Sequence, residues 1–303
     1  MNKFWGFTKR NLLLFFKNKA TIFFSMLSPI IIFVLYILFL RGTFVTALDE
    51  ASKMAQGLIT KENIDAIANG LLLSGLLGSA LFTVPYCTLT TIINDRENKI
   101  DYDISATPMS RVQIILSYFT ASAISALIMT TIVMAVGLII LCANFEMHIG
   151  ATDVLKLLGI NLLGSVCSTA MFMLIVMFFK KMTTSNAFFG LLSSVSGFII
   201  GAYIPLHEFS ETVQTICNIF PQTGITCLMR NTILSGVLTD INDKLQGMDQ
   251  GVFEQSVREV FSFNMRLCAR DFSVAQTVVY VTIITLVVIA ALGVIYPKVY
   301  KRK

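Results

Sequence analysis

One stretch constrains the fold more than any other: Val112 to Cys142 carries no charged side chain. About 20 consecutive apolar residues suffice for a helix to cross the hydrocarbon core of a bilayer, and this run is longer. The whole chain has the same character, since 55% of its residues are hydrophobic, only 14% are charged and its mean hydropathy is +0.75. Soluble domains carry about a quarter charged residues. We therefore expect an all-α integral membrane protein.

Six apolar runs, this one included, have the length of transmembrane helices. The expected spans are residues 20–40, 66–93, 112–142, 154–179, 182–203 and 273–296. The preceding residues 1–19 mix aromatic side chains with basic ones, which is typical of an N-terminal amphipathic, interfacial helix. The first span is too long for the apolar core of a signal peptide, so we expect it to remain uncleaved. The sequence thus predicts one transmembrane domain over residues 1–303.

A charged island, Asn94 to Arg111, separates the second and third spans. Its flanks carry almost no ionisable side chains, so the island must lie in water. Ile100 and Ile104 are one helical turn apart, which predicts a short helix with one apolar edge. Thr107-Pro108 predicts a break followed by an N-cap, with proline at the first position of the next helix. A solvated loop that only joins two spans is the alternative interpretation.

Residues 205–272 form a long mixed region before the last span. Its first part, Phe209 to Leu234, is apolar but interrupted by Pro221 and Gly224. This pattern predicts broken, re-entrant outer helices, because a break at membrane depth is tolerated only where protein covers it. We expect an exposed helical hairpin over Gly236 to Asp271.

The basic residues assign an orientation, because cytosolic loops are richer in Lys and Arg than outer loops. Fourteen of the 23 basic residues fall on one side of the six-span arrangement. They are Lys3, Lys9, Arg10, Lys17, Lys19, Arg96, Lys99, Arg111, Lys180, Lys181, Lys298, Lys301, Arg302 and Lys303. We therefore expect a multi-pass protein of the plasma membrane with both termini and the charged island in the cytoplasm.

The spans lack the residues that several classes of membrane protein need. None has an Asp, Glu, Lys, Arg or His near its centre, which argues against an ion-coupled secondary transporter. The chain has no G-x-x-x-x-G-K-[ST] loop for ATP phosphates and no G-x-S-x-G or H-E-x-x-H pattern for a membrane enzyme. Its net charge of +5 lies beside apolar runs, which indicates membrane orientation and not nucleic-acid binding. We expect no cofactor on this chain, so energy must come from a partner.

Candidate metal ligands and disulfides are few. Glu146, His148 and Asp153 lie in a predicted outer turn with irregular spacing, so we expect solvated side chains there rather than a metal site. The six cysteines form no C-x-x-C pattern. Three of them share the predicted outer region, where we expect free thiols and keep one disulfide as the alternative. These three are Cys217, Cys227 and Cys268.

Small and hydroxyl side chains recur every four residues in the second and fifth spans and give each a stripe for close packing. One interpretation is that these helices flank a subunit interface or a substrate path. Ordinary packing within one subunit is the other interpretation. The candidate lining residues are Gly75, Ser79, Phe82, Thr83, Tyr86 and Thr90 in the second span and Asn186, Phe188, Ser193, Ser194, Gly197, Phe198 and Gly201 in the fifth.

The charged island reads DRENK at residues 95–99 and ATPMSR at residues 106–111. With this run the chain resembles the permease, or transmembrane subunit, of an ABC exporter of the ABC-2 type, a family of drug, antibiotic and peptide exporters. Members often carry an E-R-E-K-G-T-L-like run ending in A-T-P-x-S-R. The usual glycine after the lysine is replaced here by Ile100. Farther on, Phe220-Pro221 and the following Gln222-Thr223 are similar to a family pattern outside the fifth span.

The resemblance implies partners for the chain. Two permease subunits, as a homodimer or a heterodimer, would assemble in the lipid bilayer with two copies of a separate ABC ATPase subunit, which carries ATP and Mg. It also implies that the charged island is a cytosolic coupling helix seated in a groove of the ATPase. The residues expected to couple are Ile100, Tyr102 and Ile104 as apolar contacts, with Glu97, Lys99, Asp103 and Arg111 as the charged ones.

The function that the resemblance implies is ATP-driven export from the cytoplasm. Apolar and hydroxyl-rich span surfaces favour an amphipathic drug, peptide or lipid-like substrate over a long polysaccharide. A membrane sensor or assembly protein that binds a ligand through its outer region is the alternative, and it would have no partner ATPase. A channel or uniporter fits least, since the sequence shows no filter motif, charged ring or intramembrane ion site.

Overall fold

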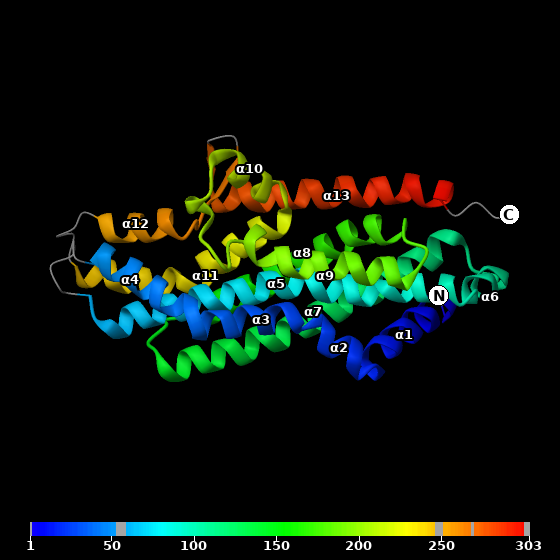
Figure 1. Ribbon diagram of the computed structural model, residues 1–303, viewed down its shortest axis with the longest axis horizontal. Coiled ribbons are helices and arrows are strands. Elements are labelled where there is room, and N and C mark those ends of the chain that lie inside the picture. The colour runs from blue at the N-terminus through cyan, green and yellow to red at the C-terminus, as the bar shows by residue number, and fades with distance from the viewer. Residues whose placement is uncertain (1, 53–58, 246–250, 268–269, 300–303) are drawn as a thin grey trace.

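The computed structural model describes residues 2–52, 59–245, 251–267 and 270–299 as an elongated bundle of helices (Figure 1). Among the described residues, five helical stretches are long and apolar enough to cross a membrane. They are Leu27–Glu50, Lys61–Glu97, Arg111–Asn144, Ala151–Val176 and Val274–Ile295. The predicted class is therefore confirmed: the chain is an all-α, multi-pass membrane protein.

The expected fifth span, residues 182–203, corresponds to α9 (Met182–Ile199), which is not one of these five stretches. α9 nevertheless runs beside α5 (Lys61–Glu97). Near one end, the hydroxyl of Tyr86 bonds to Ser185, and near the other, Gly75 lies against Ala202. The arrangement with six spans stays a prediction.

The first membrane stretch is assembled from several helical pieces after α1 (Asn2–Lys17). α2 (Lys19–Ser25) comes just before the stretch, which is made of α3 (Leu27–Leu35), a π-helical turn (Tyr36–Leu40) and most of α4 (Arg41–Ser52). Asn18 separates α1 from α2, and its side chain accepts a hydrogen bond from the backbone N–H of Thr21, as an N-cap does. This cap explains why the chain changes direction there (Figure 1).

α5 lies at the centre of the bundle. In its most apolar window 83% of the residues are buried, against 17% in Leu27–Glu50, 22% in α7 (Arg111–Asn144) and 17% in the last span. The neighbours of α5 include α7, α8 (Ala151–Val176) and α9. Pro85 lies inside α5 and has no backbone N–H, so one carbonyl of the preceding turn loses its helical partner. Ser122 of α7 donates a hydrogen bond to the carbonyl of Pro85 over 3.1 Å.

The start of α7 differs from the prediction. The break at Thr107-Pro108 is present, but Pro108 lies in the connection and the helix begins at Arg111. Ser110 is the N-cap: its hydroxyl accepts from the N–H of Gln113, and the Gln113 side chain accepts from the N–H of Ser110. This reciprocal capping box satisfies two N–H groups and outweighs the preference of proline for a first helical position.

The outer region also differs in part from the prediction. The break at Pro221 separates α10 (Glu211–Ile219) from α11 (Pro221–Lys244). The expected helical hairpin from Gly236 to Asp271 is instead the end of α11, then α12 (Val252–Val260), and then an antiparallel pair of strands. The strands are β1 (Met265–Leu267) and β2 (Arg270–Phe272), with Arg266 opposite Asp271. Strands of three residues are too short to produce a recognisable alternation in the sequence.

The thiols of the outer region are free where they are described. Cys217 of α10 and Cys227 of α11 are buried free cysteines. Cys268 lies outside the described residues. The expectation of free thiols is confirmed for the first two.

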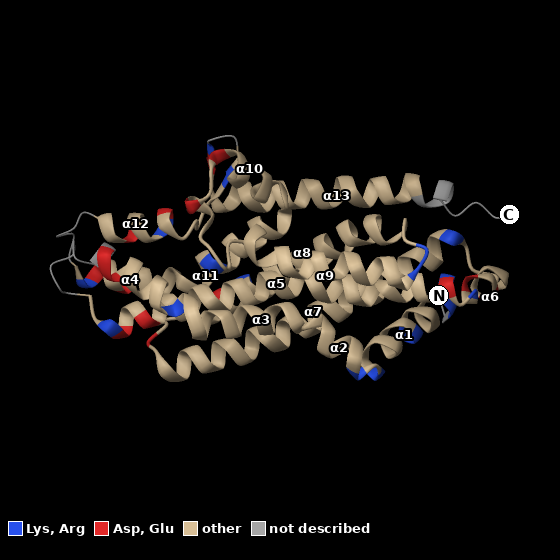
Figure 2. Cartoon of the chain, in the orientation of Figure 1, with Lys and Arg blue, Asp and Glu red and all other residues tan. Residues whose placement is uncertain are grey.

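Charged side chains gather at the two ends of the bundle and leave a largely uncharged middle (Figure 2). One end holds α4, α12 and the start of α5, and the other holds the end of α5 and α6 (Ile100–Ala106) (Figures 1 and 2). Such a distribution suits a protein that crosses the hydrocarbon layer with its middle part. We call these the outer end and the inner end, respectively, after the sides of the membrane that the basic residues predict for them.

Candidate functional site

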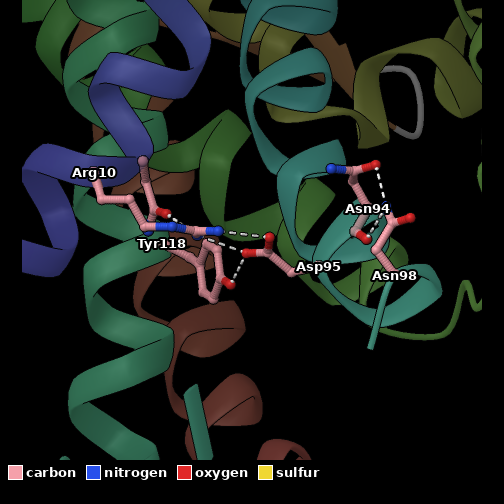
Figure 3. A network of polar contacts seen from close by, with 6 residues as sticks. Arg10, Asn94, Asp95, Asn98 and Tyr118 are labelled. Carbon is pink, nitrogen blue, oxygen red and sulfur yellow. Dashed lines mark hydrogen bonds and ion pairs between the residues drawn. The ribbon is translucent and has the colours of Figure 1, made fainter. Parts of the chain in front are cut away.

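At the inner end, α5 is tied to α1 and α7 by a buried carboxylate (Figure 3). Arg10 of α1 donates two parallel hydrogen bonds to Asp95, from Nη1 to Oδ2 over 2.7 Å and from Nη2 to Oδ1 over 2.8 Å. The hydroxyl of Tyr118 in α7 also donates to Oδ2. Asp95 is only 1% exposed, so these contacts replace its water shell. A bidentate pair of this kind fixes orientation as well as distance.

Aromatic side chains enclose this ion pair. The ring of Phe7 meets the ring of Tyr118 edge to face, with centroids 5.0 Å apart, and the Arg10 guanidinium lies 5.5 Å from the centroid of Phe7. The side chain of Asn11 accepts a further hydrogen bond from Arg10. The hydrogen bond to Asp95 is the main reason that the pKa of Arg10 is raised above its ordinary value, so this guanidinium remains charged. We name Arg10, Asp95 and Tyr118 the inner hub.

The next two residues of α5 hold the connection between α8 and α9. Arg96 donates from Nη1 to the carbonyls of Met177 and Phe179, over 2.8 and 2.7 Å. Glu97 accepts a hydrogen bond of 2.8 Å from the backbone N–H of Met182. Free carbonyls at the end of one helix and a free N–H at the start of the next are the groups that need such partners. The end of α5 therefore contacts α1, α7, α8 and α9 within three consecutive residues.

A tight turn then leads from α5 into α6. Lys99 has φ +61°, in the left-handed region, and its N–H donates to the carbonyl of Arg96. Asn98 bonds through its side chain to Asn94 (Figure 3). The left-handed residue is thus the lysine itself, and Ile100, which stands where a glycine is usual, begins the helix.

The expected coupling residues face in two directions. Ile104 is only 9% exposed and belongs to the inner apolar core, and Ile100 is half-buried against the same core. Tyr102 is 71% exposed. The exposed charged residues around it are Glu97, Lys99 and Asp103, whereas Arg111 is half-buried. Of the three expected apolar contacts, Ile100, Tyr102 and Ile104, only Tyr102 is therefore fully accessible to a partner protein.

Most of the expected path residues pack inside the chain. Gly75, Ser79, Phe82, Thr83 and Tyr86 of α5 are buried, as are Ser193, Gly197 and Gly201 on the α9 side. The hydroxyl of Ser79 lies 2.7 Å from that of Ser28 in α3, which in turn lies 2.9 Å from that of Ser196 in α9. Thr83 donates to the carbonyl of Ser25 over 2.6 Å. These contacts fit the interpretation of the stripes as packing within one subunit.

The remaining path residues lie at or near the surface of the chain. Asn186, Ser194 and Phe198 are exposed on α9, and Phe198 is 43% exposed. Phe188 and Thr90 are half-buried, and Thr90 bonds to the carbonyl of Cys87 in its own helix. A surface for a second subunit or for substrate is therefore available on the outward face of α9 and not on the stripe of α5.

The outer end contains a buried arginine that no sequence motif marks. Arg230 of α11 is only 3% exposed. Its guanidinium donates to the carbonyls of Gly201, Phe261 and Ser262 and, from Nε, to the hydroxyl of Ser74. Among the described residues it forms no ion pair with a carboxylate. The available signal was a single charge inside the otherwise uncharged stretch from Phe220 to Leu238.

The acidic turn between α7 and α8 has local roles. Asp153 accepts from the N–H of Gly150 at the start of α8 and pairs with Lys156 over 2.8 Å. His148 lies 3.6 Å from Asp240 of α11, beside a shallow hollow of about 380 Å³. In the described part of the chain, no group of three or more His, Cys, Asp or Glu residues is arranged to hold a metal ion.

Comparison with known proteins identifies the family. The profile of a family described as "ABC-2 family transporter protein" matches residues 43–296, which is most of the chain. No curated protein and no solved structure gives a significant match. The match agrees with the multi-pass helical fold and with the motif of the charged island. The chain belongs to the ABC-2 family of transporter proteins, and it is an ABC-2 type permease.

Proposed function

We propose that this permease is the transmembrane subunit of an ATP-driven exporter, powered by a separate ABC ATPase that binds at α6. Family membership supports a transport role, and the absence of a phosphate-binding loop in the sequence means that ATP must be hydrolysed elsewhere. The single observation that carries the proposal is the inner end of α5. Three consecutive residues there, Asp95 to Glu97, contact four other helices, and a short turn then leads to α6 with its exposed Tyr102.

This arrangement converts a local push into a movement of the bundle. Ile104 seats α6 on the inner core, so a force on α6 is passed to α5 rather than lost in a free loop. Asp95, Arg96 and Glu97 then distribute it to α1 and α7, to the end of α8 and to the start of α9. Packed helices respond to such a force as rigid bodies. Closure of an ATPase dimer beneath α6 would thus reorient the spans together.

Orientation and assembly complete the proposal. With α9 and the following residues 200–203 as the fifth of six spans, both termini and α6 lie in the cytoplasm, at the plasma membrane, as the basic residues indicate. Two permeases, identical or different, and two ATPase subunits form the transporter. The outward face of α9, with Asn186, Ser194 and Phe198, faces the second permease or the substrate. Its mixture of apolar and weakly polar groups suits an amphipathic drug, peptide or lipid-like molecule.

Substitution of Tyr102 tests the docking site. Because Tyr102 is 71% exposed, we expect Tyr102→Ala to change the free energy of unfolding by less than about 0.5 kcal/mol while co-purification with the ATPase and ATP-dependent transport are lost. Leu155→Ala, at a side chain 68% exposed on α8, is the matched control and should leave both intact. Full ATPase binding and transport by Tyr102→Ala would contradict the proposed site.

The sensor alternative has one observation in its favour. The outer end has its own apolar core, in which Phe44 of α4 meets Phe261 after α12, with ring centroids 5.3 Å apart. The hollow beside His148 lies on this part of the chain. A sensor would bind its ligand there and would purify without an ATPase, so co-purification separates the two functions.

A further inference from the structure

The outward half of α1 combines two kinds of exposed side chain. Lys3, Lys9 and Lys17 are exposed, and so is Lys19 at the start of α2. Between them lie apolar side chains that are also exposed: Trp5 at 53%, Leu13 at 42% and Leu14 at 43%. On a water-facing helix those apolar groups would be unfavourable, whereas on a membrane surface both kinds have a partner.

The inward half of α1 takes a different set of residues. Thr8, Asn11 and Phe15 are buried against the bundle, and Arg10 reaches Asp95. The four lysines form no ion pair with any described residue. The sequence has no acidic residue before Asp49, so α1, α2 and α3 offer none to them. α1 therefore keeps Arg10, which is paired, on its inward side and leaves three lysines without an ion pair on its outward side, and Lys19 of α2 adds a fourth.

The surface next to this half of α1 is also apolar and exposed. α2 follows directly and exposes Phe23 at 57% and Phe24 at 52%, and α3 exposes Phe33 at 45%. Phe33 belongs to the first membrane stretch, Leu27–Glu50, and Phe23 and Phe24 lie just before it, so this exposed apolar surface is suited to contact with lipid. The exposed lysines precede this apolar surface in the chain, at the place where a helix that enters a membrane would meet the headgroups. Clustered lysines beside a membrane segment attract anionic headgroups, by about 1 kcal/mol for each charge near the surface.

We propose that the outward half of α1 is a binding surface for anionic phospholipid headgroups of the inner leaflet. Arg10 links α1 to Asp95 at the end of α5. The position that α1 takes on the headgroups therefore affects the position of the inner hub. The inference deepens the proposed function, since it makes lipid charge a regulator of coupling. The binding of anionic lipid by α1 can be tested without the ATPase.

Trp5 allows a direct measurement, because it is the single tryptophan of the chain and lies within the proposed surface. The purified permease is placed in nanodiscs in which either phosphatidylcholine or phosphatidylglycerol carries a bromine quencher on its acyl chain. We expect quenching of Trp5 fluorescence by the anionic lipid to exceed quenching by the neutral lipid by about threefold, given the attraction of several lysines. High salt should reduce the difference.

A charge-matched pair of variants isolates α1. In a triple variant with Lys3→Gln, Lys9→Gln and Lys17→Gln, we expect the anionic and the neutral lipid to quench Trp5 fluorescence equally. Lys61→Gln with Lys180→Gln and Lys181→Gln removes the same charge elsewhere and should retain the preference. Equal quenching by both lipids in the unaltered protein, or no quenching by either, would overturn the inference.

The transmission step is tested in the complex with its ATPase. Transport should increase with the fraction of anionic lipid, and Arg10→Gln should remove that dependence while Trp5 keeps its preference for the anionic lipid. A lipid dependence that persists unchanged in Arg10→Gln would overturn the role of the pair. If no ATPase assembles, the proposed function fails, but the result from Trp5 still decides whether α1 binds anionic lipid.

Discussion

Arg10 at the inner end and Arg230 at the outer end are both held by well-defined hydrogen bonds, but they are satisfied by different groups. Arg10 has a side chain 32% exposed and faces the carboxylate of Asp95. Arg230 is 3% exposed and faces three backbone carbonyls and one hydroxyl. Because Arg10 is partly exposed, water can solvate its guanidinium when the contact loosens, whereas the buried Asp95 depends on its protein partners. A fully buried guanidinium among carbonyls has no such alternative.

The difference indicates two mechanical roles. Arg230 joins α5, the chain after α9 and the chain after α12, which are far apart in sequence, and it keeps the outer end as one body. Arg10 joins α1 to the end of α5, next to the proposed docking helix, through a contact that can change during a transport cycle. Three predictions test this contrast.

The largest effect is expected at Arg230. Arg230→Met keeps much of the side-chain volume but leaves the carbonyls of Gly201, Phe261 and Ser262 without this donor, which should lower the free energy of unfolding by about 3 kcal/mol. Thermal unfolding in detergent measures it. The control is Arg266→Met, because Arg266 is exposed and lies 3.7 Å from Asp271, and its change should stay below about 0.5 kcal/mol. Equal losses in the two variants would remove the distinction between the arginines.

A smaller effect is expected for the inner hub, where a double-mutant cycle measures the pair. Arg10→Gln and Asp95→Asn, alone and together, should give a coupling energy of about 1–2 kcal/mol, because the contact is bidentate and the carboxylate is buried.

The same cycle on Arg258 and Glu254, a partly exposed pair of α12, is the control and should give less than about 0.5 kcal/mol. A coupling energy near zero for Arg10 and Asp95 would show that this contact does not couple α1 to α5 energetically.

The smallest effect is expected in the turn after the hub. Lys99 has φ +61°, where glycine is unstrained, so Lys99→Gly should raise the free energy of unfolding by about 0.5–1 kcal/mol. Asn98→Gly is the control, because Asn98 has φ −87° and loses its side-chain bonds to Asn94, and it should be destabilising. Urea unfolding followed by circular dichroism distinguishes the expected gain in unfolding free energy for Lys99→Gly from the expected loss for Asn98→Gly. A loss of stability in Lys99→Gly would mean that the lysine side chain is needed in this turn.

Much of the fold follows from apolar run length alone, and some of it does not. Long uncharged runs such as Val112 to Cys142 predict spans reliably, because hydrocarbon accepts little else. The strand pair at Met265 and Phe272 could not be predicted, since three residues carry too little pattern. The start of α7 was misplaced because Pro108 is a good first residue of a helix, while the capping box of Ser110 and Gln113 lies only a few positions later.

The candidate site was located by its charges, but its inner contacts were not. Asp95 belongs to a charged island that the sequence places in water, yet it is almost completely buried, because Arg10 and Tyr118 come from helices that no local pattern connects to it. Likewise, an apolar edge on α6 is visible in the sequence, but whether it faces a partner or the chain itself is decided by tertiary packing. Ile104 faces the chain.

Pro85 gives α5 a further property. A proline inside a helix weakens the backbone hydrogen bonding of one turn, so the two parts of the helix can change their mutual angle more easily than a continuous helix bends. The part from Pro85 to Glu97 is about 18 Å long, at about 1.5 Å per residue. A rotation of about 10° at Pro85 therefore displaces its tip by about 3 Å, comparable to the length of a hydrogen bond. A small change of angle at Pro85, whose carbonyl accepts a hydrogen bond from Ser122, would thus move the charged end of α5 as one piece.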